Sequence, residues 1–132
     1  MKHQQEQLNV VCRLGFWGFA IAILVLALVP SSSPIPTTGW DKTNHLLAFA
    51  VLAFLGNHAW PGRTVAVLLG LLVYGGLIEV LQSFTADRFA EWWDLLADGV
   101  GLVFGELAAR LGRRHVRSQT EAQSARVSGP GL

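Results

Sequence analysis

Four long apolar segments, separated by short turn-forming stretches, constrain the fold of this chain more than any other feature. The segments are residues 10–29, 42–60, 64–84 and 93–111. Each is close to the length of about 20 residues that an α-helix needs to cross the hydrocarbon core of a bilayer. Between them, PSSSPIP at residues 30–36 and WPGR at residues 60–63 end the helices, because proline lacks a backbone N–H and glycine and serine favour turns. The pattern predicts four membrane-spanning helices.

The composition agrees with a membrane protein. Of the 132 residues, 52% are hydrophobic and only 14% are charged, whereas about 25% are charged in a typical soluble domain. A net charge of +1 does not favour a nucleic-acid partner. The single cysteine, Cys12, excludes an intramolecular disulfide and a cysteine-based metal site. We therefore predict an all-α fold, an integral membrane four-helix bundle with antiparallel up-down topology.

The apolar segments also define the domain limits. We expect a cytoplasmic N-terminus at residues 1–9, a four-helix transmembrane domain at residues 10–111, and a basic cytoplasmic tail at residues 112–132. The tail has few apolar residues to bury and is expected to be disordered. The first segment has an alternative interpretation as a cleaved signal peptide, because basic residues precede an apolar run. Its apolar run is longer than in most signal peptides, which favours retention.

The distribution of lysine and arginine predicts the orientation. Lys2 and Arg13 precede or begin the first segment, and Arg63 lies between the second and third. Four further arginines follow the last segment: Arg110, Arg113, Arg114 and Arg117. The loops on the other side, within residues 30–41 and 85–92, hold fewer positive charges, and these charges accumulate on the cytoplasmic side of membranes. We expect a multi-pass protein of the inner (plasma) membrane with both termini in the cytoplasm.

Polar side chains interrupt the second, third and fourth segments near their predicted outer ends. They are Asp41, Lys42 and His45, then Glu79 and Gln82, then Asp94 and Asp98, with Arg88 in the loop before the last segment. A helical rise of 1.5 Å per residue places His45, Glu79 and Asp98 each about 8–9 Å below the outer end of its helix. Spacings of three or four residues place the polar side chains of each helix on one face. We expect them to form one binding site in the outer leaflet.

Several of these residues have a purely structural alternative. Asp41 and Asp94 are well placed to cap the N-termini of their helices, where a carboxylate accepts backbone N–H bonds. Lys42 can extend its ammonium group to the lipid head groups. His45 can form a hydrogen bond to a neighbouring helix. For these four residues the sequence leaves both interpretations open.

Glu79 and Asp98 are harder to explain structurally. Neither can cap a helix end, and an ionisable group within an apolar run costs about 3 kcal/mol on insertion scales. A functional pair is therefore favoured over an interhelical hydrogen bond that involves one protonated carboxyl group. Small residues at Gly75, Gly101 and Gly105 predict that the third and fourth helices pack closely and hold the two acidic groups together.

Taken together, four motifs resemble those of the VanZ-like membrane proteins. They are DKxxH followed by LLAF, GxxIExxQxF, an arginine in the following loop, and WDLLADGVGLVFG. The resemblance covers most of residues 40–106 and implies a small polytopic protein of the bacterial cell envelope, in a family whose founding member is associated with teicoplanin resistance. The positions that match the polar positions of the family are Asp41, Lys42, His45, Glu79, Gln82, Arg88 and Asp94. Asp98 departs from the family, which often has asparagine there.

Three classes of function fit this pattern. In the favoured one, Lys42, Arg88 and His45 bind the phosphate or carboxylate of an anionic envelope lipid or lipid-linked cell-wall precursor through charge-assisted hydrogen bonds. In the second, the carboxylates and His45 serve an intramembrane hydrolase or transferase, as acid and base or as ligands of a divalent cation. In the third, the chain is a subunit of a proton-coupled transporter, acting with a second copy or another membrane protein. We expect no resident cofactor, no dedicated metal site and no nucleic-acid partner.

Overall fold

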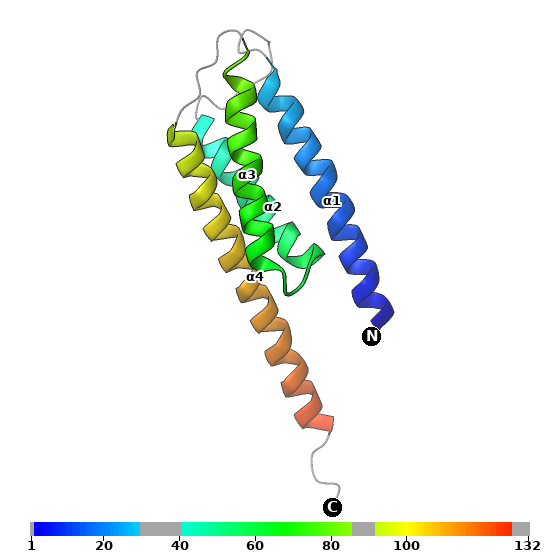
Figure 1. Ribbon diagram of the computed structural model, residues 1–132. Coiled ribbons are helices and arrows are strands. Elements are labelled where there is room, and N and C mark those ends of the chain that lie inside the picture. The colour runs from blue at the N-terminus through cyan, green and yellow to red at the C-terminus, as the bar shows by residue number, and fades with distance from the viewer. Residues whose placement is uncertain (1, 30–40, 86–91, 128–132) are drawn as a thin grey trace, which may run out of the picture.

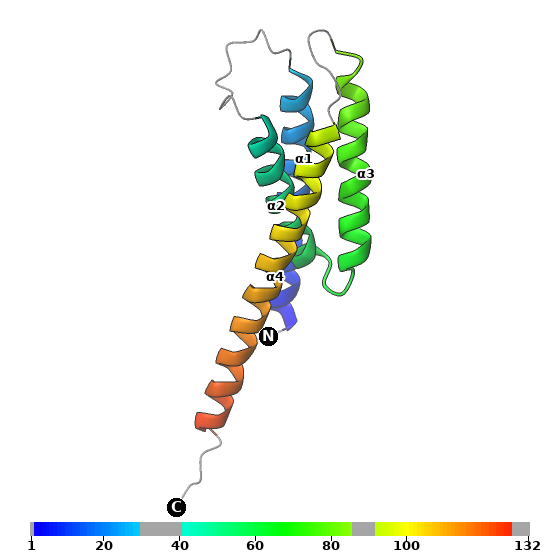
Figure 2. The same ribbon diagram turned by 90° about the vertical axis from the view of Figure 1, so that its left-hand side faces the viewer.

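The fold is all-helical over the described residues, which in this computed structural model are 2–29, 41–85 and 92–127 (Figure 1). Four helices occur in the order α1 (Lys2–Leu28), α2 (Asp41–Ala59), α3 (Thr64–Gln82) and α4 (Trp92–Val127), and these residues contain no strand. The predicted all-α fold with four helices is thereby confirmed. The first turns of α2 and α4 lie at the same end of the bundle as the last turns of α3 (Figures 1 and 2).

Helix α2 lies at the centre of the packing and contacts each of the other three helices, α4 most extensively. Its Phe49, Leu52 and Ala53 are fully buried. The other buried members of the same cluster are Phe16, Ala20, Leu71, Ile78 and Leu102. Because α2 contacts both α3 and α4, a polar side chain near its first turn can reach both of these helices.

Glycines allow α4 to approach α2 closely. A Cβ atom added to Gly101 would meet the backbone of Leu46, and one added to Gly105 would meet the backbone of Ala50. We expected this pair of glycines to bring α4 against α3, and that expectation is corrected. A repeat of small residues shows that a helix has a close-packing face, but it carries no information about which neighbour occupies that face.

Side-chain hydrogen bonds attach α3 to α1. The Tyr74 hydroxyl donates to the carbonyl oxygen of Ala20 at 2.5 Å. At the end of the helix, the Gln82 amide donates to the carbonyl oxygen of Ala27 at 3.1 Å. Both acceptors are backbone groups of α1, so α1 is connected to the bundle by directional bonds as well as by apolar contact.

Two helices, His3–Leu28 and Thr64–Gln82, are long and apolar enough to cross a membrane by their length and composition. We expected four such helices. The other two fall short because α2 begins with polar residues and the apolar part of α4 contains Asp94, Asp98 and Glu106. Most residues of the two apolar helices are not buried, and Leu14, Ile21 and Val73 are more than half exposed.

Helix α4 extends well past the predicted end of the fourth apolar segment. We expect disorder beyond the first turn of the tail that follows Gly112, whereas the structure continues the helix to Val127. The side chains of residues 112–126 are all exposed. Local pairs such as Arg117 Nε to Glu121 Oε1, at 2.9 Å and four residues apart, support this extension. The extension therefore adds a solvent-facing helix and no core.

Candidate functional site

The candidate site begins with a histidine–aspartate pair that joins α2 to α4. His45 Nδ1 lies 2.9 Å from Asp98 Oδ1, across 53 residues of sequence. The Asp98 side chain is fully buried and that of His45 is 10% exposed. At this distance the imidazole Nδ1–H donates to the carboxylate, which orients the ring and assigns the proton to Nδ1.

A glycine of α3 makes room for this aspartate. A Cβ atom added to Gly75 would lie 2.5 Å from Asp98 Oδ2 and 3.2 Å from the Phe49 ring. Asp98 Oδ2 is buried and accepts no hydrogen bond from the residues that the structure describes. A buried carboxylate oxygen in this condition is costly, so the position of Asp98 calls for a reason beyond packing.

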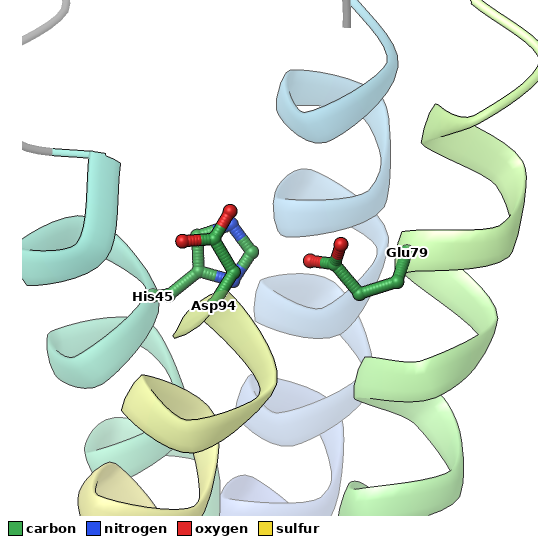
Figure 3. Close-up of side chains that lie close together, drawn as sticks. All are labelled: His45, Glu79 and Asp94. Atoms are coloured by element: carbon green, nitrogen blue, oxygen red, sulfur yellow. The ribbon is translucent and has the colours of Figure 1, made fainter. Parts of the chain in front are cut away.

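Two further carboxylates complete the cluster. His45, Glu79 and Asp94 each offer one ligand atom, and these atoms all lie within 4.8 Å of one another. Glu79 is 8% exposed and Asp94 is 6% exposed. Figure 3 shows the Glu79 side chain extending from α3 toward His45 and Asp94. Three helices thus supply donor atoms to one buried position near the end of the bundle.

The chemistry of the cluster is predominantly acidic. It contains three carboxyl groups and one imidazole, drawn from α2, α3 and α4. Ionised carboxylates this close repel one another, and burial removes most of the water that would weaken the repulsion. The arrangement therefore favours a shared proton, a bound cation, or a ligand that donates hydrogen bonds.

The remaining predicted site residues have different surroundings. Gln82 is buried, but its amide donates to α1 and is not part of the cluster. Lys42 is exposed and lies one turn before His45 on α2. Asp41 is the first residue of α2, and its side chain, like the whole of Arg88, falls outside the described residues.

Two buried polar residues outside the cluster, Asn57 and Glu106, bond to residues of their own helices, α2 and α4. The Asn57 amide donates to the carbonyl oxygen of Ala53 at 2.9 Å, a bond that no sequence signal pointed to. Glu106 accepts from Arg110 Nε, as its spacing of four residues predicts, and lies 3.6 Å from Arg113 Nη2. Glu106 is therefore a buried carboxylate that lies beside two arginines of its own helix.

The fold and the cluster define a class of protein: a four-helix, all-α chain with a buried carboxylate–histidine cluster near one end. Comparisons with protein-family models, with curated proteins and with solved structures give no match. The resemblance to VanZ-like proteins therefore stays a prediction from the motifs.

Proposed function

We propose that the chain is a multi-pass protein of the inner (plasma) membrane, with four antiparallel helices and both termini in the cytoplasm. The outward apolar side chains of α1 and α3 support this topology, because a soluble protein rarely exposes contiguous apolar surface of this kind. The polar side chains of α2 and α4 that would be costly in lipid are turned toward each other. The bias of lysine and arginine supplies the orientation.

Within that topology, the chain binds the head group of an anionic envelope lipid or lipid-linked precursor at the outer end of the bundle. The observation that carries the proposal is the burial of His45, Glu79, Asp94 and Asp98 between three helices. Ionisable groups inside a membrane bundle are expensive, and they usually mark a path or a site for a ligand. The cluster is predicted to lie in the outer leaflet, close below the level of the lipid head groups.

The charge of the cluster limits which head groups fit. The carboxylates repel a phosphate that approaches alone, whereas they accept hydrogen bonds from hydroxyl, amide or ammonium groups. Lys42, exposed one turn nearer the helix end, offers a cation for the phosphate. The best ligand therefore combines an anionic group with hydrogen-bond donors, as glycerol- and sugar-bearing phospholipids do.

Binding by purified protein tests this proposal. The full chain in detergent would be incubated with vesicle-derived phosphatidylglycerol, and separately with phosphatidylcholine, and retained lipid would be measured by native mass spectrometry. We expect saturable retention of the anionic, hydroxyl-bearing lipid and little retention of the zwitterionic one. Equal, non-saturable retention of both would contradict a head-group site.

A second candidate function is supported by the His45–Asp98 pair. A buried aspartate that accepts from Nδ1 orients an imidazole so that Nε2 can act as a general base. The chain would then be an intramembrane hydrolase or transferase acting on the same class of lipid. Release of a lipid product that wild-type protein generates and the Asp98→Asn variant does not would favour this candidate over binding alone.

A further inference from the structure

We propose that His45, Glu79 and Asp94 bind one divalent transition-metal ion, with Asp98 orienting the histidine. The role of the metal in head-group binding rests on the proposed function. The metal site itself rests on the positions of the side chains. The ion would be held by His45 Nε2 and by one carboxylate oxygen each from Glu79 and Asp94. The three ligands come from α2, α3 and α4, so the sequence contains no short motif that would reveal them.

The spacing of the donor atoms suits a single ion. His and carboxylate ligands bind Zn²⁺ at about 2.0–2.2 Å, which separates two ligands of a tetrahedral site by about 3.5 Å. One ring nitrogen of His45 and one carboxylate oxygen each of Glu79 and Asp94 lie within 4.8 Å of one another. Side-chain rotations that move the donor atoms inward by roughly 1 Å bring them to coordination distance.

The aspartate behind the histidine is an independent sign of a metal site. Histidines that bind metals almost always donate their other N–H to a carboxylate, carbonyl or water, which fixes the tautomer and the ring orientation. His45 Nδ1 makes this contact with Asp98 Oδ1 at 2.9 Å. Asp98 is fully buried, and Gly75 provides the space for its second oxygen. Asp98 thus holds the His45 ring in an orientation that leaves Nε2 as the nitrogen that can bind the metal.

A divalent ion also suits the acidic character of the cluster. Its positive charge would offset part of the negative charge that the ionised carboxyl groups of Glu79, Asp94 and Asp98 bring to this position. Three protein ligands leave a coordination position open, as in catalytic zinc sites. A phosphate oxygen of a lipid head group can occupy that position, so the metal supplies the attraction for an anion that the carboxylates lack.

The ligand set indicates which ions to test. Imidazole suits Zn²⁺ and other transition metals, and carboxylates suit Mn²⁺ as well, whereas Mg²⁺ and Ca²⁺ prefer oxygen ligands alone. The chain's single cysteine, Cys12, is on α1 and does not belong to the cluster. We therefore infer selectivity for Zn²⁺ or Mn²⁺ over Mg²⁺.

Metal binding to purified full-length protein tests the inference directly. Protein in detergent would be stripped with a chelator and titrated with ZnCl₂ or MnCl₂ by equilibrium dialysis, with bound metal counted by mass spectrometry. We expect one tight site per chain, and binding weaker by at least about 10-fold in Glu79→Gln and in Asp94→Asn. Asp98→Asn should weaken binding by about 10- to 100-fold without removing a ligand.

Matched controls separate this site from surface binding. Glu106→Gln removes a buried carboxylate elsewhere on α4, and a His58→Gln, His115→Gln double variant removes histidines outside the cluster; both should keep wild-type affinity. Circular dichroism would check that each variant remains helical. Absence of a tight site in the wild type, or unchanged affinity in folded Glu79→Gln and Asp94→Asn, would overturn the inference.

Lipid retention measured with and without chelator separates two claims: that the cluster binds a metal ion, and that the chain binds an anionic lipid head group. Retention of the anionic lipid that is lost on chelation and restored by Zn²⁺ or Mn²⁺ supports both. Retention that survives complete metal removal overturns the bridging role and leaves the proposed function in place. Tight metal binding at the cluster with no lipid retention supports the metal site and contradicts the proposed function.

Discussion

At the scale of single residues, the polar end of the bundle depends on a few small spaces. Gly75 of α3 faces Asp98 of α4 and Phe49 of α2, one turn from Glu79 on the same helix. The absence of a side chain at Gly75 lets the buried aspartate reach His45. A substitution at Gly75 is therefore expected to disturb the site, although glycine has no functional side chain of its own.

Gly75→Ala should weaken both packing and the site. A Cβ atom at this position would lie 2.5 Å from Asp98 Oδ2, so the aspartate or the helix must move. We expect a loss of stability of about 1–3 kcal/mol, seen as a lower thermal midpoint in detergent, together with weaker metal binding. Gly76→Ala is the matched control, because a Cβ atom there meets nothing within 4 Å. A Gly75→Ala protein as stable as the Gly76→Ala control would contradict this account.

Most of the cluster could be predicted from the sequence, and the exceptions have physical causes. Helical rise predicts one depth for His45, Glu79 and Asp98. In the structure His45 lies 2.9 Å from Asp98 and shares a group of possible ligand atoms with Glu79 and Asp94. Gln82 was assigned to the site from its spacing, but its amide is used to bond α1. The metal geometry could not be predicted, because its ligands are brought together only by the packing of three helices.

At the scale of helices, α1 behaves as part of the bundle. It contributes Phe16 and Ala20 to the buried cluster and accepts hydrogen bonds from Tyr74 and Gln82 of α3. The Arg13 side chain donates to the carbonyl oxygen at the end of α2. Loss of α1 would expose the apolar surface beneath it and leave two donors of α3 without acceptors.

We therefore predict that the first segment is retained rather than cleaved as a signal peptide. The intact mass of the chain purified from membranes should be close to 14.3 kDa. A variant with small residues and a consensus cleavage site introduced after residue 29 would serve as the processed reference. A wild-type protein that has lost residues 1–29 would show that the contacts of α1 do not persist in the mature protein.

The helices themselves illustrate what apolar patterning can and cannot predict. All four helices were expected, because each contains an apolar run bounded by turn residues or by a change to polar sequence. Their ends were less predictable. Helix α4 continues to Val127 because arginine, glutamate, glutamine and alanine are good helix formers even where there is no core. The prediction that the glycine face of α4 packs against α3 was also wrong, because this face packs against α2. The sequence does not specify which neighbouring helix a face contacts.

At the scale of the whole molecule, the ligands that can reach the cluster depend on the orientation of the bundle in the membrane. The cluster lies near the first turns of α2 and α4 and in the last turn of α3. The distribution of lysine and arginine predicts that this end is outside the cell. An outer-leaflet site has access to envelope lipids and precursors after export. The same site on the cytoplasmic side would serve a different set of ligands.

Cysteine labelling tests the orientation. In a Cys12→Ser background, a cysteine at Ser32 should react with a membrane-impermeant maleimide in intact cells. A cysteine at Arg113 should react only after permeabilisation, because the positive side faces the cytoplasm. Labelling of the Arg113 position from outside would reverse the topology and move the proposed site to the inner leaflet.

The resemblance to VanZ-like proteins leads to a cellular prediction. Expression of the wild-type chain in a susceptible bacterium should reduce sensitivity to teicoplanin, and equal expression of Glu79→Gln should not. The amide keeps the size and most hydrogen bonds of the carboxylate but loses its charge and its affinity for metal. Equal protection by both forms at matched membrane levels would assign Glu79 to packing, since amides also hydrogen-bond across helices.

The central claim is that the buried carboxylate–histidine cluster is a binding site, and lipid retention by paired variants tests it most directly. Phosphatidylglycerol retention would be measured by native mass spectrometry for wild type, Glu79→Gln and Glu106→Gln, each shown by circular dichroism to be helical. Glu79 and Glu106 are both buried glutamates, but only Glu79 belongs to the cluster. The account predicts that Glu79→Gln lowers lipid affinity by at least about 10-fold, or about 1.4 kcal/mol, while Glu106→Gln retains wild-type affinity. Equal affinity in all three proteins would contradict it.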